Sequence, residues 1–352
     1  MSRTTCVVIS LVVIVLAGAP ASADDYAEGL AAYSRQDYAT ALRHFRTAAE
    51  AGNVPAQSSL GMMYLSGEGV AQDRVQAVRW ILSAAMKGDA KAQFTLGSMH
   101  EQGIGAPLSD EQAVRWYQSA AEQGYVSAQH NLGVMYEDGR GVKQDFTEAV
   151  KWYRLAAEQG FEKSQINLAV MFGSGNGVPQ DYAEAAKWYR RAAEQGHLGA
   201  QLNIAYMLAA GQGVRKDAAE AVKWYRRAAE QGDSSAQYNL GVIYDEGRGV
   251  SQDRAEAVTW FRRAAEQGDA AAQFSLGLNF ALGAGVPKDY VQAHKWISLA
   301  AARYSTDEAA ERANAVTALG MLAPDMTPAQ LAEAGKLVQA WQPKAEAQGT
   351  SK

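Results

Sequence analysis

The chain has 352 residues, 48% of them hydrophobic, and its 38 acidic and 33 basic side chains give a formal net charge of −5 at pH 7. Acidic and basic residues are interspersed, so the clustered basic face of a nucleic-acid-binding protein is missing and no nucleic acid partner is expected. Cys6 is the one cysteine, which excludes a fold held together by disulfides.

Residues 1–23 have the pattern of a secretory signal peptide. A short basic start at Arg3 precedes an apolar run, 7–16, that is interrupted by Ser10, and Ala21-Ser22-Ala23 has the small-x-small form of a cleavage site. The run is too short to cross a bilayer comfortably. We therefore expect cleavage after Ala23 and no membrane span in the mature chain, rather than an uncleaved anchor.

Cleavage would also remove Cys6. Because this cysteine stands near the start of the apolar run and not just after it, a lipid anchor is not expected. A mature exported chain without cysteine must be stabilised by packing alone, and it favours the periplasm of a Gram-negative bacterium over the extracellular medium. The sequence predicts a periplasmic or secreted protein.

Residues 24–52 predict a short helix pair that caps the N-terminal end. Tyr33 and Phe45 take the places that tyrosines occupy in later units, and His44 takes the place of a tryptophan. The segment that connects the two helices, 34–37, is shorter than its later counterparts.

Between residues 53 and 304 the chain repeats one unit seven times. A tryptophan recurs every 36 residues without a register slip, at Trp80, Trp116, Trp152, Trp188, Trp224, Trp260 and Trp296. A period of this length is the signature of a solenoid, in which each unit buries its apolar face by stacking on its neighbours. We therefore expect one elongated domain and a binding surface distributed over many repeats.

The unit at 125–160 shows how a repeat is built. Apolar residues at helical spacing predict a first helix over 127–137, which a glycine-containing loop then ends. Asp145 and Glu148 have the spacing of a capping box that opens a second helix, and the same spacing recurs at Asp181/Glu184 and Asp217/Glu220. Gly160 stands where a left-handed residue would end that helix.

The second helix carries an apolar stripe opposite a charged face. The stripe consists of Ala149, Trp152, Tyr153, Ala156 and Ala157. One helix pair cannot bury such a stripe, so we expect each tryptophan to pack into the alanine rows of the adjacent repeat.

These residues carry a family resemblance. The run A-x-x-L-G-x-x-Y, then G-x-G-V-x-x-D, then E-A-V-K-W-Y-R-x-A-A-E-Q-G is similar to the Sel-one-like repeat (SLR) family, which is related to tetratricopeptide repeats. The resemblance implies an all-α fold, a right-handed α/α superhelical solenoid of helix-turn-helix repeats, and an adaptor role. It also makes 24–52 a tetratricopeptide-like cap. The mature chain lacks the cysteines of the secreted family members, so their particular activities are not carried over.

Residues 305–343 predict two helices that cap the C-terminal end. Ser305 and Glu308 have the spacing of a capping box for the first, and Thr327 and Gln330 open the second. Residues 344–352 are expected to form a flexible tail.

The sequence shows no motif for catalysis or for metal or cofactor binding. The five histidines occur singly, without the spacing of zinc ligands. The glycine loops lie between two helices, with no G-K-[ST] and no preceding strand, so they do not predict a phosphate site. G-x-S-x-G is missing, and no serine stands three residues before a lysine, as serine hydrolases and β-lactamases require. We expect no catalytic residue, no metal and no cofactor.

Function is expected at positions that vary between repeats, because constant positions maintain the stack. Aligned on Leu132, the positions two before, two after and five after it vary and share one face of the first helix. By resemblance to tetratricopeptide repeats, this face lines the concave side of the solenoid. Aromatic residues there would anchor a protein or peptide, and acidic ones would favour a basic partner. The predicted partner-binding residues are Phe94, Glu101, His130, Glu137, Tyr206, Tyr238, Asp245 and Phe274.

Alternatives stay open for both the face and the function. The positions two before and two after Leu132 are largely apolar and could instead be core. The leading hypothesis is an exported, non-catalytic adaptor that binds a protein or peptide in envelope regulation or assembly. A scaffold for an envelope polysaccharide or secretion machine is one alternative. A cell-wall-active enzyme, such as a β-lactam- or peptidoglycan-acting hydrolase, is the other.

Overall fold

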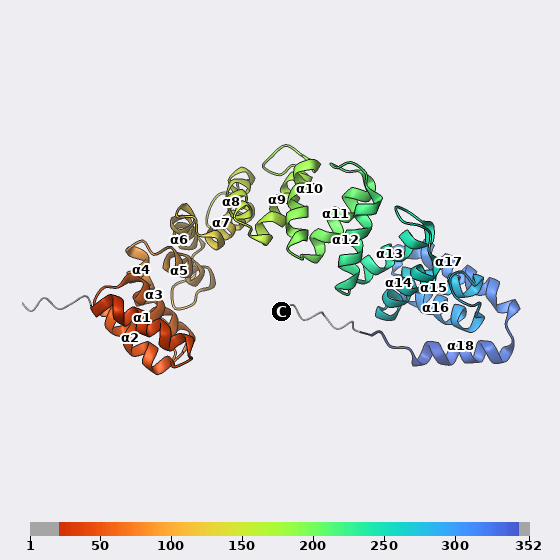
Figure 1. Cartoon of the computed structure of the whole chain (residues 1–352), viewed down its shortest axis with the longest axis horizontal. Coiled ribbons are helices and arrows are strands. Elements are labelled where there is room, and N and C mark those ends of the chain that lie inside the picture. The colour runs from red at the N-terminus through yellow and green to blue at the C-terminus, as the bar shows by residue number, and fades with distance from the viewer. Residues whose placement is uncertain (1–20, 345–352) are drawn as a thin grey trace, which may run out of the picture. The chain divides into compact units, whose positions relative to one another are not determined.

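The computed structural model describes residues 21–344, and every regular element within that range is a helix (Figure 1). The all-α solenoid that the tryptophan period predicts is confirmed, because the helices follow one another in consecutive pairs. The α-helices are α1 (Ala21–Ser34), α2 (Tyr38–Glu50), α3 (Val54–Ser66), α4 (Arg74–Met86), α5 (Ala90–Gln102), α6 (Asp110–Glu122), α7 (Val126–Asp138), α8 (Phe146–Glu158), α9 (Glu162–Ser174), α10 (Tyr182–Glu194), α11 (Leu198–Ala210), α12 (Ala218–Glu230), α13 (Ser234–Glu246), α14 (Arg254–Gln267), α15 (Ala270–Leu282), α16 (Tyr290–Arg303), α17 (Ala309–Leu322) and α18 (Pro328–Ala340).

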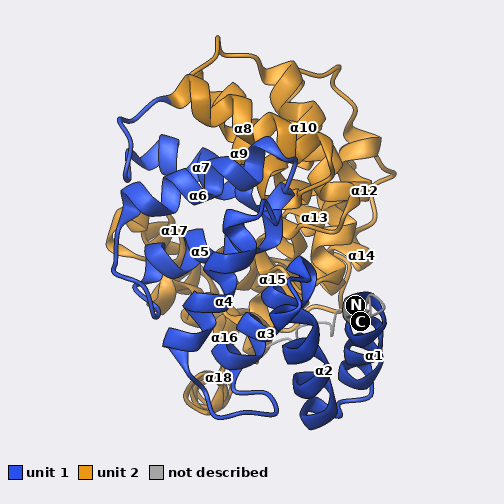
Figure 2. Ribbon diagram, turned by 90° about the vertical axis from the view of Figure 1, so that its left-hand side faces the viewer, with its two compact units in different colours: residues 1–145 blue, residues 146–352 orange. Residues whose placement is uncertain are grey.

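The chain divides into two compact units, residues 1–145 with α1–α7 and residues 146–352 with α8–α18 (Figure 2). Within each unit, the first helix of a repeat packs on its own second helix, and the second helix packs on the first helix of the next repeat. Most of the predicted signal peptide, 1–20, and most of the predicted tail, 345–352, lie outside the described residues.

The repeat boundaries follow from backbone chemistry at the helix ends. The first helix expected at 127–137 is α7, and it ends at Gly139, whose φ of 70° is the left-handed conformation that glycine adopts without steric cost. The expected aspartate caps are present at α10 and α12. Asp181 accepts a hydrogen bond from the Glu184 backbone N–H, and Asp217 accepts one from the Glu220 backbone N–H.

The glutamate half of the expected capping box differs in these two helices. The Glu184 carboxylate accepts a hydrogen bond from Lys187 Nζ at 3.0 Å, and the Glu220 carboxylate pairs with Arg190. A charged donor forms a stronger hydrogen bond than the neutral backbone N–H of the cap residue, so the nearby cation takes the carboxylate.

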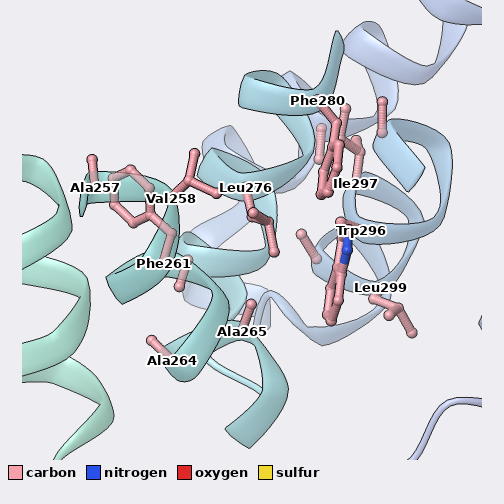
Figure 3. Packing of buried hydrophobic residues seen from close by; sticks show 14 of the residues in the cluster. Ala257, Val258, Phe261, Ala264, Ala265, Leu276, Phe280, Trp296, Ile297 and Leu299 are labelled. Atoms are coloured by element: carbon pink, nitrogen blue, oxygen red, sulfur yellow. The ribbon is translucent and has the colours of Figure 1, made fainter. Parts of the chain in front are cut away.

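The core lies between the two helices of each repeat and between successive repeats. In the second unit, Phe261, Leu276 and Ile297 from three consecutive helices are buried in one cluster (Figure 3). The alanine rows of the second helices are also buried, as expected. A glycine in the first helix permits close approach: a Cβ at Gly97 would lie 2.7 Å from the Tyr117 ring.

A row of buried glutamines, which the sequence reasoning missed, connects the repeats. In the first helix of each repeat from α3 to α15, a glutamine donates its Nε2 to a backbone carbonyl near the end of the preceding second helix, as from Gln201 to Ala193 at 3.3 Å. A second glutamine extends the row, because Gln231 Nε2 donates to Gln201 Oε1 at 2.8 Å. Each of these carbonyls near the helix end also accepts the N–H of the glycine three residues later, as Ala193 does from Gly196 at 3.0 Å, so the glutamine adds a second donor to it. The signal was the glutamine that follows alanine in the first helices from α3 to α15, with Ser164 in place of the alanine in α9.

The C-terminal helices begin at the expected caps. Both capping boxes, Ser305/Glu308 and Thr327/Gln330, are present with their reciprocal bonds. A short 3₁₀ turn precedes α17, and a second one separates α17 from α18. Helix α18 packs on α16, and the Trp341 ring that follows it lies edge-on to Trp296 with centroids 6.4 Å apart.

Candidate functional site

Five positions recur where the first helices of successive repeats meet. They lie near the end of one first helix, at the start and in the middle of the following second helix, in the middle of the next first helix, and at the centre of the next loop. We call this set a joint. The three joints compared below are α5/α7 (Glu101, Asp110, Tyr117, Asn131, Arg140), α11/α13 (Ala209, Ala218, Tyr225, Asn239, Arg248) and α13/α15 (Asp245, Arg254, Phe261, Ser275, Ala284).

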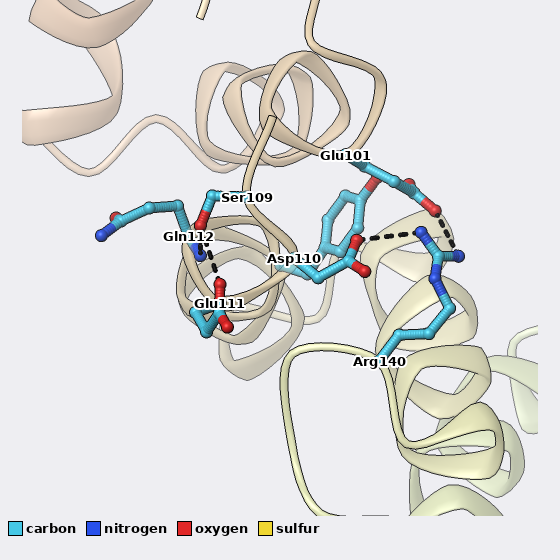
Figure 4. Close-up of polar contacts among 7 residues, drawn as sticks. Glu101, Ser109, Asp110, Glu111, Gln112 and Arg140 are labelled. Atoms are coloured by element: carbon cyan, nitrogen blue, oxygen red, sulfur yellow. Dashed lines mark hydrogen bonds and ion pairs between the residues drawn. The ribbon is translucent and has the colours of Figure 1, made fainter. Parts of the chain in front are cut away.

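The α5/α7 joint is closed by a polar cluster (Figure 4). The Tyr117 hydroxyl donates to Glu101 Oε2 at 2.5 Å, and Arg140 Nη1 donates to Glu101 Oε1 at 3.0 Å. The second terminal nitrogen of Arg140 donates to Asp110 Oδ1 at 2.9 Å, so the guanidinium lies between two carboxylates. Burial and the bond to Glu101 raise the pKa of Tyr117. The Tyr117 hydroxyl and both terminal nitrogens of Arg140 therefore have carboxylate acceptors within the chain.

The α11/α13 joint is an open pocket of about 460 Å³. Its lining includes Ala209, Ala218, Tyr225 and Arg248, together with Lys216 from the loop before α12. The lining contains two cations and no carboxylate. Burial raises the pKa of Tyr225 above its ordinary value. A tyrosine hydroxyl is protonated at neutral pH and can donate a hydrogen bond.

The α13/α15 joint is a pocket of about 490 Å³ with a mixed lining. Arg254 Nε lies 3.6 Å from Asp245 Oδ1, and both side chains are more than one-third exposed. Asn279, 7% exposed, replaces the methionine or isoleucine that the first helices from α3 to α13 carry at this position. Its amide donates to the Ser275 carbonyl at 2.9 Å.

The predicted aromatic anchors divide into packed and exposed rings. Phe94 is half-buried, with its centroid 5.6 Å from that of Tyr117, and Tyr238 lies 5.9 Å from Phe261 in the same way. Phe274 is also half-buried, against the core of the second unit. The position two before Leu132 is therefore partly core, as the alternative held. Tyr206, at the position two after, is 59% exposed.

The predicted polar residues are all half-buried. Glu101 is already engaged by Tyr117 and Arg140, and Asp245 lines a pocket beside Arg254. His130 and Glu137 also have partners within the chain. The structure brings two sets of predicted residues together: Phe94 and Glu101 contact the same tyrosine, and Tyr238 and Asp245 line the same pocket.

Sequence reasoning missed Arg140, Arg248 and Lys216. A signal existed for Lys216, because four other repeats carry glutamine at this position: Gln72, Gln144, Gln180 and Gln252. Each of these glutamines donates to a backbone carbonyl near the end of the preceding first helix, at 2.6–2.8 Å. Lysine stands at this position in two repeats, as Lys216 and Lys288, and adds a charge where the other repeats carry an uncharged side chain.

One histidine does not stand alone in space. His44 Nδ1 lies 2.9 Å from Asp25 Oδ1, and His44 Nε2 lies 3.4 Å from Glu28 Oε2. The two ring nitrogens therefore face different carboxylates, and the contacts connect α2 to α1. The sequence spacing could not reveal this cluster, because its members come from both helices of the cap.

Comparison with known proteins agrees with the helix pairs and the period. The model of the Sel1 repeat matches eight segments, at 23–53, 54–89, 90–125, 126–161, 162–197, 199–233, 234–269 and 270–305. The chain belongs to the Sel1 repeat family. The first match covers the N-terminal pair, for which the resemblance implies a tetratricopeptide-like cap, so this pair counts as an eighth Sel1 repeat.

Two solved structures of this family resemble the chain over most of its length. A protective antigen of uropathogenic Escherichia coli is 30% identical, with a TM-score of 0.60, over 90% of this chain and 83% of its own. A Sel1 repeat protein from Oxalobacter formigenes is 35% identical, with a TM-score of 0.59, over 86% of this chain and 87% of its own. No protein with a curated description matches.

Sel1-repeat proteins generally act as scaffolds for protein–protein interaction. The fold is typically non-catalytic. Across residues 21–344, none of the helices combines the length and the apolar character needed to cross a membrane.

Proposed function

We propose that this Sel1-repeat protein is an exported, non-catalytic adaptor that binds a protein or peptide partner through the exposed face of its first helices, in bacterial envelope regulation or assembly. The observation that carries the proposal is the pair of neighbouring pockets at the α11/α13 and α13/α15 joints, which share Val242 in their linings. Tyr206 on α11 is 59% exposed and carries a large aromatic ring toward solvent. Tyrosine is enriched among the residues that carry most of the binding energy at protein interfaces.

The sequence predicts a basic partner for this face because of Glu101, Glu137 and Asp245. In the structure, two of these acids lie near cations of the chain itself. Glu101 is bound within its own joint, and Asp245 lies near Arg254. In the second unit, aromatic and apolar contacts from Tyr206 and the pocket walls therefore supply most of the proposed recognition, with charge acting locally in each pocket.

Export is part of the proposal and rests on residues 1–23. The apolar run and the Ala21-Ser22-Ala23 site support cleavage before Asp24 and delivery to the periplasm. The intact mass of the protein from a periplasmic fraction tests this. A mass that begins at Met1, or recovery in the cytoplasm, contradicts it.

Site-specific photocross-linking tests the binding face. A photoreactive phenylalanine analogue in place of Tyr206 should cross-link to one defined protein partner in cells. The matched control is the same analogue at Leu155, which is 40% exposed on the second helix α8 of the same unit. The proposal fails if Tyr206 gives no adduct, or if both positions give the same adducts.

A further inference from the structure

The α5/α7 and α11/α13 joints share their donors and differ in their acceptors. The tyrosine, asparagine and arginine of the first joint recur three repeats later as Tyr225, Asn239 and Arg248. The two carboxylates do not recur. Ala209 stands where the first joint has Glu101, and Ala218 stands where it has Asp110. Three donor side chains are thus retained around the space that two carboxylates fill in the first joint.

These donors lack the acceptors that satisfy their counterparts. The Tyr225 hydroxyl makes no hydrogen bond to the residues that the structure describes, whereas Tyr117 binds a carboxylate at 2.5 Å. Within residues 21–344, the one ion pair of Arg248 joins its Nε to Glu246. Its terminal nitrogens, the atoms with which Arg140 holds two carboxylates, have no acidic partner within that range.

Other joints do not keep this combination. The α3/α5 joint also has a pocket, of about 260 Å³, but its tyrosine and loop positions are Ile81 and Ile104. The α13/α15 joint has Phe261 in place of the tyrosine and supplies its own acid, Asp245. The α11/α13 joint adds a second cation, Lys216, for which no ion pair is found among the described residues.

We propose that the α11/α13 pocket binds a carboxylate that a partner supplies, namely the side chain of an aspartate or glutamate in an extended peptide segment. The inference rests on the proposed function and deepens it, because it specifies one residue of the partner. The carboxylate takes the place that Glu101 has in the first joint. It accepts hydrogen bonds from Arg248 and the Tyr225 hydroxyl, and Lys216 at the rim adds a second positive charge.

The pocket favours a carboxylate carried on an aliphatic stem. The template in the α5/α7 joint is itself a glutamate side chain, held by one terminal guanidinium nitrogen and one hydroxyl. Ala209, Ala221 and Val242 line the pocket with apolar surface against which a methylene stem can pack. A peptide fits better than an isolated anion, because Tyr206 and the next pocket offer contacts for neighbouring residues.

Peptide display on the purified full-length chain tests this inference. Dodecapeptides that bind should be enriched in aspartate or glutamate. Changing the enriched acid of a selected peptide to its amide should weaken binding to the wild type roughly tenfold, because a charge-assisted hydrogen bond is lost. Arg248→Gln should cause a similar loss with the acidic peptide. It should cause little further loss with the amide peptide, since the two groups would contact each other.

A matched pair of variants at one position provides the control. Ala209→Glu supplies the carboxylate of the first joint within the chain, so it should abolish the preference for the acidic peptide. Ala209→Gln has nearly the same size without the charge and should keep that preference. Circular dichroism confirms that each variant is folded, and Arg248→Gln tests the pocket without adding volume.

The outcomes separate this inference from the proposed function. If selected peptides carry no acid, or if Arg248→Gln and Ala209→Glu leave the acidic preference unchanged, the carboxylate site is wrong. A partner that still cross-links at Tyr206 would then leave the proposed function standing. If no peptide is retained, the inference is equally overturned, and the cross-linking result decides the proposed function separately.

Discussion

The α5/α7 and α11/α13 joints occupy the same place in their repeats, yet one is filled by its own side chains and the other is open. Arg140 closes the first joint because Glu101 and Asp110 reach it from the preceding repeat. Alanines at both acidic positions leave the second joint as a pocket of about 460 Å³, where the Tyr225 hydroxyl and the terminal nitrogens of Arg248 have no carboxylate partner within residues 21–344. A repeat protein can therefore open a site by shortening two side chains, while the helices around the site stay the same.

The contrast between the two joints requires that core packing, and not the residues of the joints, holds the repeats together. Trp188, 2% exposed on α10, fills a buried position of the second unit. Trp188→Ala should lower the free energy of unfolding by about 3–5 kcal/mol, because it leaves a large cavity in the core. Thermal or denaturant unfolding measures the loss. The matched control is Trp341→Ala, near the chain end and only half-buried, which should cost clearly less. Equal losses at the two positions would contradict the stacking account.

Removing an acidic side chain should lower the free energy of unfolding more in the α5/α7 joint than in the α13/α15 joint. Glu101→Ala leaves Tyr117 without its acceptor and Arg140 with Asp110 as its one carboxylate partner, and it should cost about 1–2 kcal/mol after allowance for partial exposure. Asp245→Ala is the comparison, since its contact with Arg254 is 3.6 Å long and solvent-exposed. That change should cost about 0.5 kcal/mol or less. Denaturant unfolding of both variants measures the two losses. Similar losses of unfolding free energy would contradict the distinction between the joints.

The tyrosines of the two joints should also respond differently to alkaline pH. Burial raises the pKa of both, and the bond to Glu101 raises that of Tyr117 further. A raised pKa in the folded state stabilises the protein below the unfolded value of about 10, and this contribution is lost as the pH rises through the folded value. Glu101→Gln removes the charged acceptor and should lower the pKa of Tyr117. The same change should leave Tyr225 unaltered.

Ultraviolet difference absorbance follows the formation of tyrosinate and so measures the change in the tyrosine pKa. Tyr117→Phe and Tyr225→Phe variants assign the two transitions. If Glu101→Gln shifts both transitions, or neither, the carboxylate does not act on Tyr117 as the structure indicates.

The sequence was sufficient to predict the features that repeat. The tryptophan period predicted the helix pairs, and the aspartates at Asp181 and Asp217 predicted the caps, because these depend on local backbone chemistry. Tyr206 was placed on the exposed face correctly. The half-buried state of Phe94 and Tyr238 could not be predicted with certainty, because it depends on the ring that each meets on the second helix.

The polar contacts between repeats were beyond sequence reasoning for a different reason. Glu101 and Arg140 stand in different repeats, and their contact depends on how the loop after α7 places the arginine against α5. The pocket at the α11/α13 joint arises because alanines replace two acidic side chains. An alanine such as Ala209 does not by itself indicate a binding site in the sequence. It becomes informative once the structure shows what Glu101 does at the same position.

Opening the closed joint tests the central claim most directly. Glu101→Ala combined with Asp110→Ala gives the first unit the same residues at these positions as Ala209 and Ala218 give the second. Isothermal titration calorimetry with an acidic peptide selected on the wild type measures the stoichiometry. The account predicts one additional peptide site per chain in the folded double variant, abolished again by Arg140→Gln. An unchanged stoichiometry would contradict the claim that the two joints are the filled and open forms of one site.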